Sequence, residues 1–156
     1  MAVLGGWAAV NMAAGGVGLV TAQDPRWRGF HLGNLSWNAV NLGIAGAGWL
    51  TQAREAPGAG FPETLLASQK TRVVLAVNAG IDVAYITAGA WIRSQGLTAG
   101  DATRQGVGEA VAANGLFLLG FDVAMLALHG RNDGRLVRPW VAGTGDAAQL
   151  GVVIRR

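Results

Sequence analysis

The sequence predicts an all-α integral membrane protein, a four-helix bundle of up-down-up-down topology with both termini in the cytoplasm. Two observations predict this class. Apolar residues make up 51% of the 156 residues and charged residues only 13%, about half the charge of a typical soluble domain. The apolar residues also fall into four long runs, which are separated by polar stretches rich in turn-forming residues.

The four runs cover about residues 2–21, 30–51, 72–92 and 107–129. Each is close to the ~20 residues that a helix needs to cross the hydrocarbon core of a bilayer. A soluble bundle would need a charged outer face on each helix, and these runs contain almost no charge. The first run carries Asn11 and lacks a basic start, so we expect a retained span and not a signal peptide. Residues 1–130 should form the bundle and residues 131–156 a basic tail.

The distribution of basic residues predicts the orientation of the bundle. With four spans, the N-terminus, residues 52–71 and the tail lie on one side, which holds eight of the twelve lysines and arginines. Such an excess marks the cytoplasmic side. The expected location is therefore the bacterial inner membrane, crossed several times. The net charge of +3 is modest and predicts no nucleic-acid partner. Small residues such as Gly43 and Ala47 predict close helix contacts.

Each run places its polar side chains on one helical face. Residues at i, i+4 and i+7 share a face, so Asn34, Asn38 and Asn41 form a stripe on the second run beside Trp37. Lipid is an unfavourable neighbour for such a face, so the stripes of all four runs should meet inside the bundle. The corresponding residues elsewhere are Trp7 and Asn11, then Asn78, Asp82 and Tyr85, then Asn114, Phe121 and Asp122.

The two aspartates carry the functional hypothesis. An asparagine in a span most often holds helices together, at about 0.6 kcal/mol per hydrogen bond. A charged carboxyl at mid-bilayer costs roughly 2.5–3.5 kcal/mol, so an aspartate there implies an occupant. Carboxylate and amide oxygens suit a hard cation, and neighbouring carboxyls share protons. We predict that one chamber binds or conducts a cation or a proton, with the ligands Asp82, Asp122, Asn11, Asn38, Asn41, Asn78 and Asn114.

Two other functions remain open from the sequence. The bundle core could bind a small apolar ligand such as a quinone, a carotenoid or a lipid, with walls formed by Trp7, Trp37, Tyr85, Phe117 and Phe121. Alternatively, the chain is a scaffold or accessory subunit of a homo-oligomer or larger membrane complex. An enzyme is disfavoured, because cysteine is absent and no nucleophile–base pair, phosphate loop or metal-ligand spacing appears. No cofactor is indicated.

Three blocks of sequence carry a resemblance to a known family: GNLSWNAVNLGIAGAG, VNAGIDVAYITAGAWIR and GLFLLGFDVAMLALH. Together they resemble a family of small bacterial integral membrane proteins catalogued as a domain of unknown function. The likeness covers nearly all of residues 3–129. It implies the four-span fold and motif positions at Asn34, Trp37, Asn38, Asn41, Asn78, Asp82 and Asp122, and it implies no activity.

Overall fold

A computed structural model of the chain describes residues 2–52, 61–144 and 147–154. They form four helices, α1 (Ala2–Thr21), α2 (Pro25–Gln52), α3 (Phe61–Ala99) and α4 (Ala102–Leu136), followed by the strands β1 (Val137–Thr144) and β2 (Ala147–Ile154). Two compact units result. The first contains residues 1–58 and 80–119, and the second contains residues 59–79 and 120–156.

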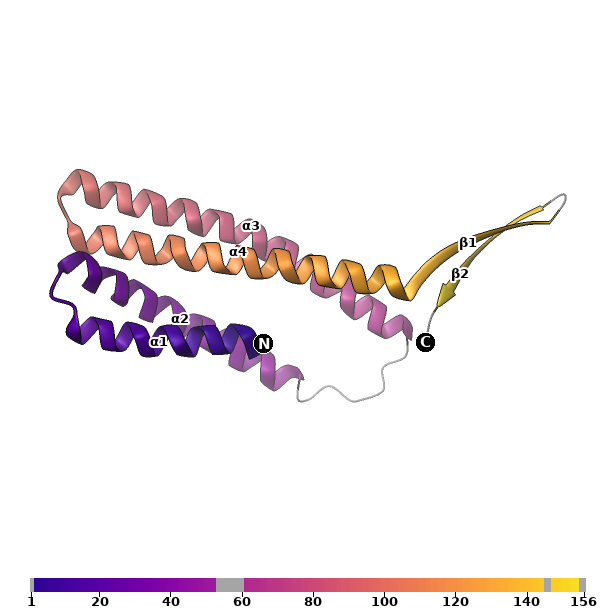
Figure 1. Cartoon of the computed structure of the whole chain (residues 1–156), viewed down its shortest axis with the longest axis horizontal. Coiled ribbons are helices and arrows are strands. Elements are labelled where there is room, and N and C mark those ends of the chain that lie inside the picture. The colour runs from indigo at the N-terminus through magenta and orange to yellow at the C-terminus, as the bar shows by residue number, and fades with distance from the viewer. Residues whose placement is uncertain (1, 53–60, 145–146, 155–156) are drawn as a thin grey trace. The chain divides into compact units, whose positions relative to one another are not determined.

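The first unit is a bundle of four helical segments. It contains α1, α2, the C-terminal part of α3 and the N-terminal part of α4. Within each pair, α1 with α2 and α3 with α4, the helices run antiparallel and are joined by a short turn (Figure 1). The predicted all-α bundle of four helices is therefore present.

The turn between α1 and α2 is built by Asp24. Its Oδ1 accepts the backbone N–H groups of Arg26 and Trp27 at 2.8 Å and 3.1 Å. This is the N-cap arrangement that satisfies otherwise unpaired donors at a helix start. Pro25 follows as the first helical residue, where a missing N–H has no cost. The polar stretch between the first two apolar runs thus ends one helix and starts the next.

The turn between α3 and α4 depends on one glycine. Gly100 has a φ of 66°, the left-handed conformation that commonly ends a helix. The N–H of Asp101 then donates to the carbonyl of Gly96 at 2.9 Å. Asp101 also caps α4, since its Oδ1 accepts the N–H of Arg104 at 3.0 Å. Both turns at this end of the first unit therefore follow the same capping rule.

Helices α3 and α4 extend well beyond the predicted apolar runs. Residues 93–99 and 102–106, which we expected between spans, are helical, and α3 already begins at Phe61. The turn at Gly100 needs only two residues, so the polar residues on either side continue the helices. Pro62, one of the expected breakers, lies in the first turn of α3, where proline is tolerated. The apolar runs therefore predicted the presence of each helix but underestimated the length of α3 and α4.

The polarity of the protein is inverted relative to a soluble domain. Among the residues whose burial the structure describes, glycines aside, four apolar residues are buried, namely Ala8, Ala45, Leu75 and Ala110. Six polar residues are buried, and the largest fully buried side chains are Asn38 and Asn114. Large apolar side chains cover the outside instead; Val3, Val10 and Val17 of α1 are each more than 60% exposed. Such an arrangement is stable where the surrounding solvent is lipid.

Three helices of the described chain are long and apolar enough to cross a membrane: Ala2–Thr21, Leu66–Ala99 and Ala102–Asn132. They indicate a multi-pass membrane protein. Helix α2 is not among them, because three asparagines lie within its apolar stretch and lower the hydropathy there. Those asparagines are buried, while Val40, Ile44 and Leu50 of the same helix are more than half exposed.

Glycines let the helices of the first unit approach closely. A Cβ added to Gly106 of α4 would overlap the carbonyl oxygen of Arg26 in α2. Gly89 of α3 and Gly108 of α4 face each other's backbone in the same way. Close backbone approach is how helices associate in lipid. The specific contact expected at Gly43 is wrong, because an added Cβ there would meet no atom within 4 Å.

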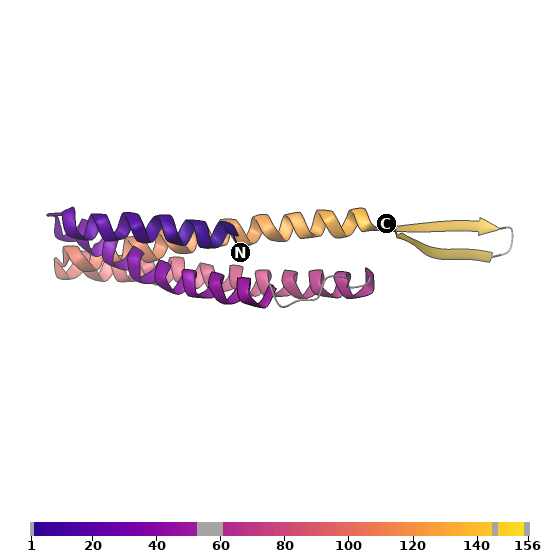
Figure 2. The ribbon, with the colours of Figure 1, turned by 90° about the horizontal axis from the view of Figure 1, so that it is seen from below.

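The second unit contains residues 61–79 of α3, residues 120–136 of α4 and a β-hairpin. A hydrogen bond of 3.3 Å joins Ser68 Oγ and His129 Nδ1 across the two helices. The strands pair antiparallel from Val137↔Ile154 to Thr144↔Ala147, as Figure 2 shows. The predicted basic tail thus contains the last turns of α4 and a two-stranded sheet.

Candidate functional site

Four asparagine side chains of the first unit form one hydrogen-bonded network across three helices. Asn38 Nδ2 of α2 donates to Asn114 Oδ1 of α4 at 3.0 Å, and Asn114 Nδ2 donates to Asn34 Oδ1 at 2.9 Å. Asn38 Nδ2 also donates to Asn34 Oδ1 at 3.0 Å. Asn34 Nδ2 in turn reaches Asn11 Oδ1 of α1 at 3.1 Å. The stripes predicted on α1, α2 and α4 therefore do meet inside the bundle.

The network is also anchored to the helix backbones. Asn11, Asn38 and Asn114 each donate from Nδ2 to the carbonyl four residues earlier, at 2.9 Å. Each amide is therefore held in one orientation before it contacts another helix. A set of amides that satisfy one another and their own backbones fixes helix register. The hydrogen bonds of these four residues are explained by their role in holding the helices together.

Asp82 of α3 lies at the level of this network. It is only 3% exposed, and a Cβ added to Gly115 of α4 would lie 3.2 Å from the Asp82 carbonyl oxygen. Gly115 is the neighbour of Asn114 in sequence, so α4 places the amide network and the Asp82 backbone within one helical turn of each other.

Asn41 of α2 lies at the same level of the bundle as Asp82. Trp37 of α2 and Tyr85 of α3 meet edge to face, with ring centroids 4.6 Å apart. The two helices run antiparallel there, because Arg26 near the start of α2 and Arg93 near the end of α3 both bind Glu109. Asn41 follows Trp37 by four residues along α2, and Asp82 precedes Tyr85 by three residues along α3. Because the helices are antiparallel, both residues lie in the same direction from the pair of rings. Both residues are buried. We call Asn11, Asn34, Asn38, Asn41, Asp82 and Asn114 the polar layer.

Two amide atoms of the polar layer are buried without a hydrogen-bond partner among the described residues. They are Asn38 Oδ1 and Asn41 Nδ2. An unsatisfied buried polar atom costs about 1–3 kcal/mol, so such an atom needs an explanation beyond packing. Asn41 differs from the other amides of the layer, since no hydrogen bond of its side chain to another described residue is present. Asn41 is therefore the amide of the polar layer whose burial is not explained by hydrogen bonds between helices.

The aromatic residues form pairs within the first unit. Trp7 of α1 stacks on Phe117 of α4 with ring centroids 3.7 Å apart and an interplanar angle of 6°. Trp37 packs on Tyr85 as described above. The two indole Nε1 atoms are buried without a hydrogen-bond partner. Trp37 also lines an open, apolar groove of about 370 Å³ between α2 and α4. Rings expected to form the wall of one ligand pocket instead pack largely against one another.

Three predicted site residues belong to the second unit. Asp122 of α4 is buried at 6% exposure, and Phe121 beside it is half-buried. Asn78 of α3 is exposed, and its predicted place among the ion ligands stays a prediction. The second unit contains helical segments from α3 and α4 only, and this leaves one flank of α3 without a helix neighbour in that unit. The chamber predicted to contain both Asp82 and Asp122 stays a prediction.

A charged cluster at the turn end of the first unit was missed by the sequence reasoning. Glu109 of α4 binds Arg26 of α2 through both carboxylate oxygens, at 2.5 Å and 3.0 Å, and Arg93 of α3 through Oε1 at 2.8 Å. Its hydrogen bond to Glu109 raises the pKa of Arg26 above its ordinary value. An acidic residue among arginines near three helix ends was the available signal for this cluster.

Among the described residues, no group of three or more His, Cys, Asp or Glu side chains is placed to hold a metal ion. Residues 3–123 match the model of a Family of unknown function (DUF6992). The chain belongs to this family. The DUF6992 match spans both helical pairs and ends just after Asp122, so it contains the whole polar layer. No curated protein and no solved structure matches the chain.

Proposed function

We propose that this DUF6992 protein is a four-span membrane bundle that binds and passes a proton or a monovalent cation through the polar layer. The observation that carries the proposal is the burial of the Asp82 carboxyl at the level of the amide network. An ionisable residue inside a membrane bundle is a functional site by default, because its cost to folding is high. A proton or monovalent cation is favoured over a divalent ion, which usually takes several carboxylates.

The exposed tryptophans of α2 support a fourth span. Trp27 and Trp49 are 59% and 72% exposed, and 22 residues of helix separate them by about 33 Å at 1.5 Å per residue. That length matches the ~30 Å hydrocarbon core, and tryptophan concentrates at its two boundaries. With its asparagines turned inward, α2 presents an apolar surface to lipid between these rings.

Asn41 is the second residue that we assign to the binding site. The Asn41 side chain makes no hydrogen bond to another described residue, and the buried atom that lacks a partner is the donor Nδ2. The orientation of an amide follows from its hydrogen-bond partners, so flipping this amide would place Oδ1 where Nδ2 now lies, and that oxygen would bind a cation at the Asp82 carboxylate. The other amides would then act as a fixed wall.

The proposal is tested by ion-gradient flux in proteoliposomes. Asp82→Asn keeps the shape of the side chain and removes its charge. We expect the flux of protons or of a monovalent cation to fall at least tenfold, the change that corresponds to roughly 1.5–3 kcal/mol for a hydrogen bond to a charged group. Asp122→Asn, tested in parallel, shows whether the second buried carboxyl belongs to the same path.

Asp101→Asn provides the matched control. It makes the same chemical change at the exposed cap of α4, and asparagine caps a helix as well as aspartate does. Its flux should equal that of the wild-type protein. Equal flux in the wild-type protein, Asp82→Asn and Asp101→Asn would refute the proposal.

A scaffold or accessory subunit is the second candidate, and the self-paired amide network favours it. If the polar layer serves only helix register, substituting both Asp82 and Asp122 by leucine leaves the bundle folded and any complex that contains it intact. As a scaffold, the wild-type protein and this double variant show the same ion flux, whereas under our proposal the double variant loses the flux of the wild-type protein. The two functions therefore predict different flux results for a variant that folds.

A further inference from the structure

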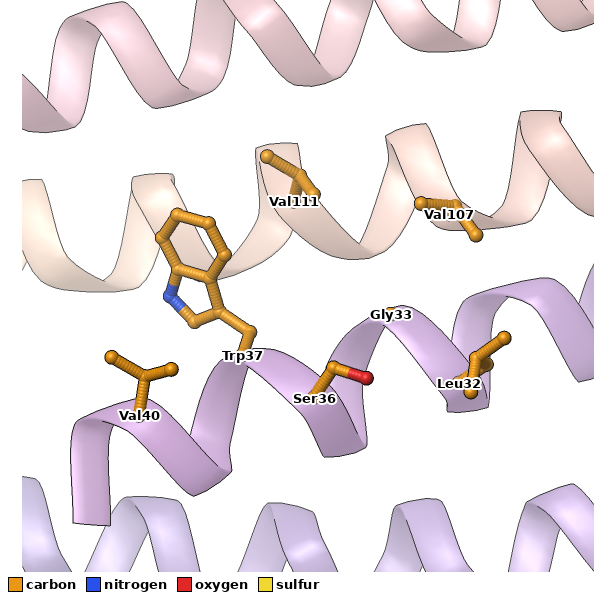
Figure 3. A pocket seen from close by; sticks show the side chains of 7 residues that line it. All are labelled: Leu32, Gly33, Ser36, Trp37, Val40, Val107 and Val111. Carbon is orange, nitrogen blue, oxygen red and sulfur yellow. The ribbon is translucent and has the colours of Figure 1, made fainter. Parts of the chain in front are cut away.

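Two cavities of the first unit lie next to each other and share one lining residue, Leu32 of α2. The apolar groove contains Leu32, Trp37 and Val40 of α2 and Val107 and Val111 of α4. Figure 3 shows Trp37 projecting from α2 toward Val111. The second cavity, of about 290 Å³, lies nearer the turn end and also contains Leu32. Leu32 therefore belongs to both cavities.

We call these two cavities together the furrow, and the polarity of its lining changes along its length. The cavity nearer the turn end is the more polar of the two, because Gln23, Arg28 and Thr103 line it beside the apolar side chains of Leu19, Pro25 and Leu32. The groove beyond Leu32 is almost entirely apolar. Residues 28, 32, 36 and 40 of α2 share one helical face, as do residues 103, 107 and 111 of α4. The furrow thus has a polar mouth at the turn end and an apolar body that runs along the helices.

The length and charge of the furrow match one class of ligand. From residue 28 to residue 40 the helix rises about 18 Å, slightly more than half of the ~30 Å hydrocarbon core. Arg28 makes no ion pair with another described residue, whereas Arg26 and Arg93 are held by Glu109. The described residues of this end carry four positive and three negative charges: Arg26, Arg28, Arg93 and Arg104 against Asp24, Asp101 and Glu109.

We propose that the furrow is a binding site for one anionic phospholipid, with its phosphate at Arg28 and one acyl chain in the groove between α2 and α4. The free guanidinium and the neighbouring hydroxyl of Thr103 supply donors for phosphate oxygens. The apolar body supplies the contact surface for a chain that enters one leaflet. This site is separate from the polar layer and does not depend on ion binding there.

Native mass spectrometry of the purified full chain tests the headgroup. Phosphatidylglycerol and phosphatidylcholine of the same chain length are titrated into the protein. We expect one phosphatidylglycerol to bind per chain, with higher affinity than phosphatidylcholine. Arg28→Gln should bind phosphatidylglycerol about fivefold more weakly, the effect of one arginine near an anionic lipid. Arg104→Gln, at the same end but outside the furrow, should retain wild-type affinity.

The acyl chain is tested by filling the groove. Val40→Trp places a large ring in the furrow, and Val17→Trp places the same ring on α1; both valines are 63% exposed, so both variants should fold. We expect Val40→Trp to lose bound phosphatidylglycerol and Val17→Trp to keep it. Glycerol phosphate without acyl chains should not displace the lipid.

Three results would overturn the proposal. They are equal affinity of Arg28→Gln and Arg104→Gln for phosphatidylglycerol, equal retention of the lipid by Val40→Trp and Val17→Trp, and displacement of the lipid by glycerol phosphate. The last result would assign the polar mouth to a free anion. None of these outcomes affects the flux experiment on Asp82, so the two proposals fail independently.

Discussion

Replacing Gly106 by alanine is expected to lower the free energy of unfolding of the first unit by about 2–3 kcal/mol, the cost of overpacking a tight contact. The added Cβ would overlap the carbonyl oxygen of Arg26 and lie 2.6 Å from the backbone nitrogen of Phe30. Both atoms belong to the backbone of α2, so no side chain can move aside. Helices α2 and α4 would have to separate, which weakens the amide network between them.

The measurement is unfolding of the purified protein by titration of SDS into mild detergent micelles, followed by circular dichroism. Gly16→Ala is the matched control, since an added Cβ there meets no atom within 4 Å. Alanine stabilises a helix interior by roughly 0.5–1 kcal/mol relative to glycine, so this variant should be neutral or slightly more stable. Equal effects of the two substitutions would contradict the close packing of α2 on α4.

Replacing Asn38 by leucine is the second large effect, and we expect a loss of about 2 kcal/mol. Asn38 is fully buried and its Nδ2 donates to Asn34 O, Asn34 Oδ1 and Asn114 Oδ1. Hydrogen bonds between membrane helices average about 0.6 kcal/mol, but leucine also leaves the Asn114 Oδ1 acceptor buried without its donor. The same unfolding titration measures the loss.

Asn41→Leu is the matched control for Asn38→Leu. Asn41 has the same side chain, lies on the same helix and is nearly as buried, yet its Nδ2 has no hydrogen-bond partner. We expect Asn41→Leu to change the stability by less than about 0.5 kcal/mol, or to raise it, because a polar group buried without a partner is removed. If the two variants were equally destabilised, the division of the layer into structural and ion-binding amides would be wrong.

The polar stripes could be predicted from the sequence because they depend only on helical periodicity. Spacing of three and four residues placed Asn34, Asn38 and Asn41 on one face, and the cost of polar groups in lipid turned that face inward. The same rule did not determine the burial of Asn78, which shares the spacing with Asp82 but is exposed. Periodicity defines the face of a single helix, whereas burial depends on how many other helices surround that part of it.

Other features depend on contacts that no local pattern contains. The pairing of Trp7 with Phe117 and the binding of Glu109 by Arg26 and Arg93 join residues far apart in the chain. Which glycines make close contacts likewise depends on the helix that lies opposite, so Gly106 and Gly43 look alike in the sequence. The β-hairpin follows a helix that runs beyond its apolar part, where hydropathy gave no indication of either element.

Reactivity of single cysteines in membrane vesicles tests the central claim most directly. The chain has no cysteine, so Asp82→Cys and Val17→Cys each introduce the only thiol. A small cationic methanethiosulfonate reagent reacts with thiols that water and ions reach. We predict that Asp82→Cys is labelled although residue 82 is buried, and that Val17→Cys is not labelled although Val17 is 63% exposed, because lipid covers it. Both should react after denaturation in SDS. Labelling of Val17→Cys in intact vesicles, or failure to label Asp82→Cys, would contradict a bundle with lipid outside and an ion path within.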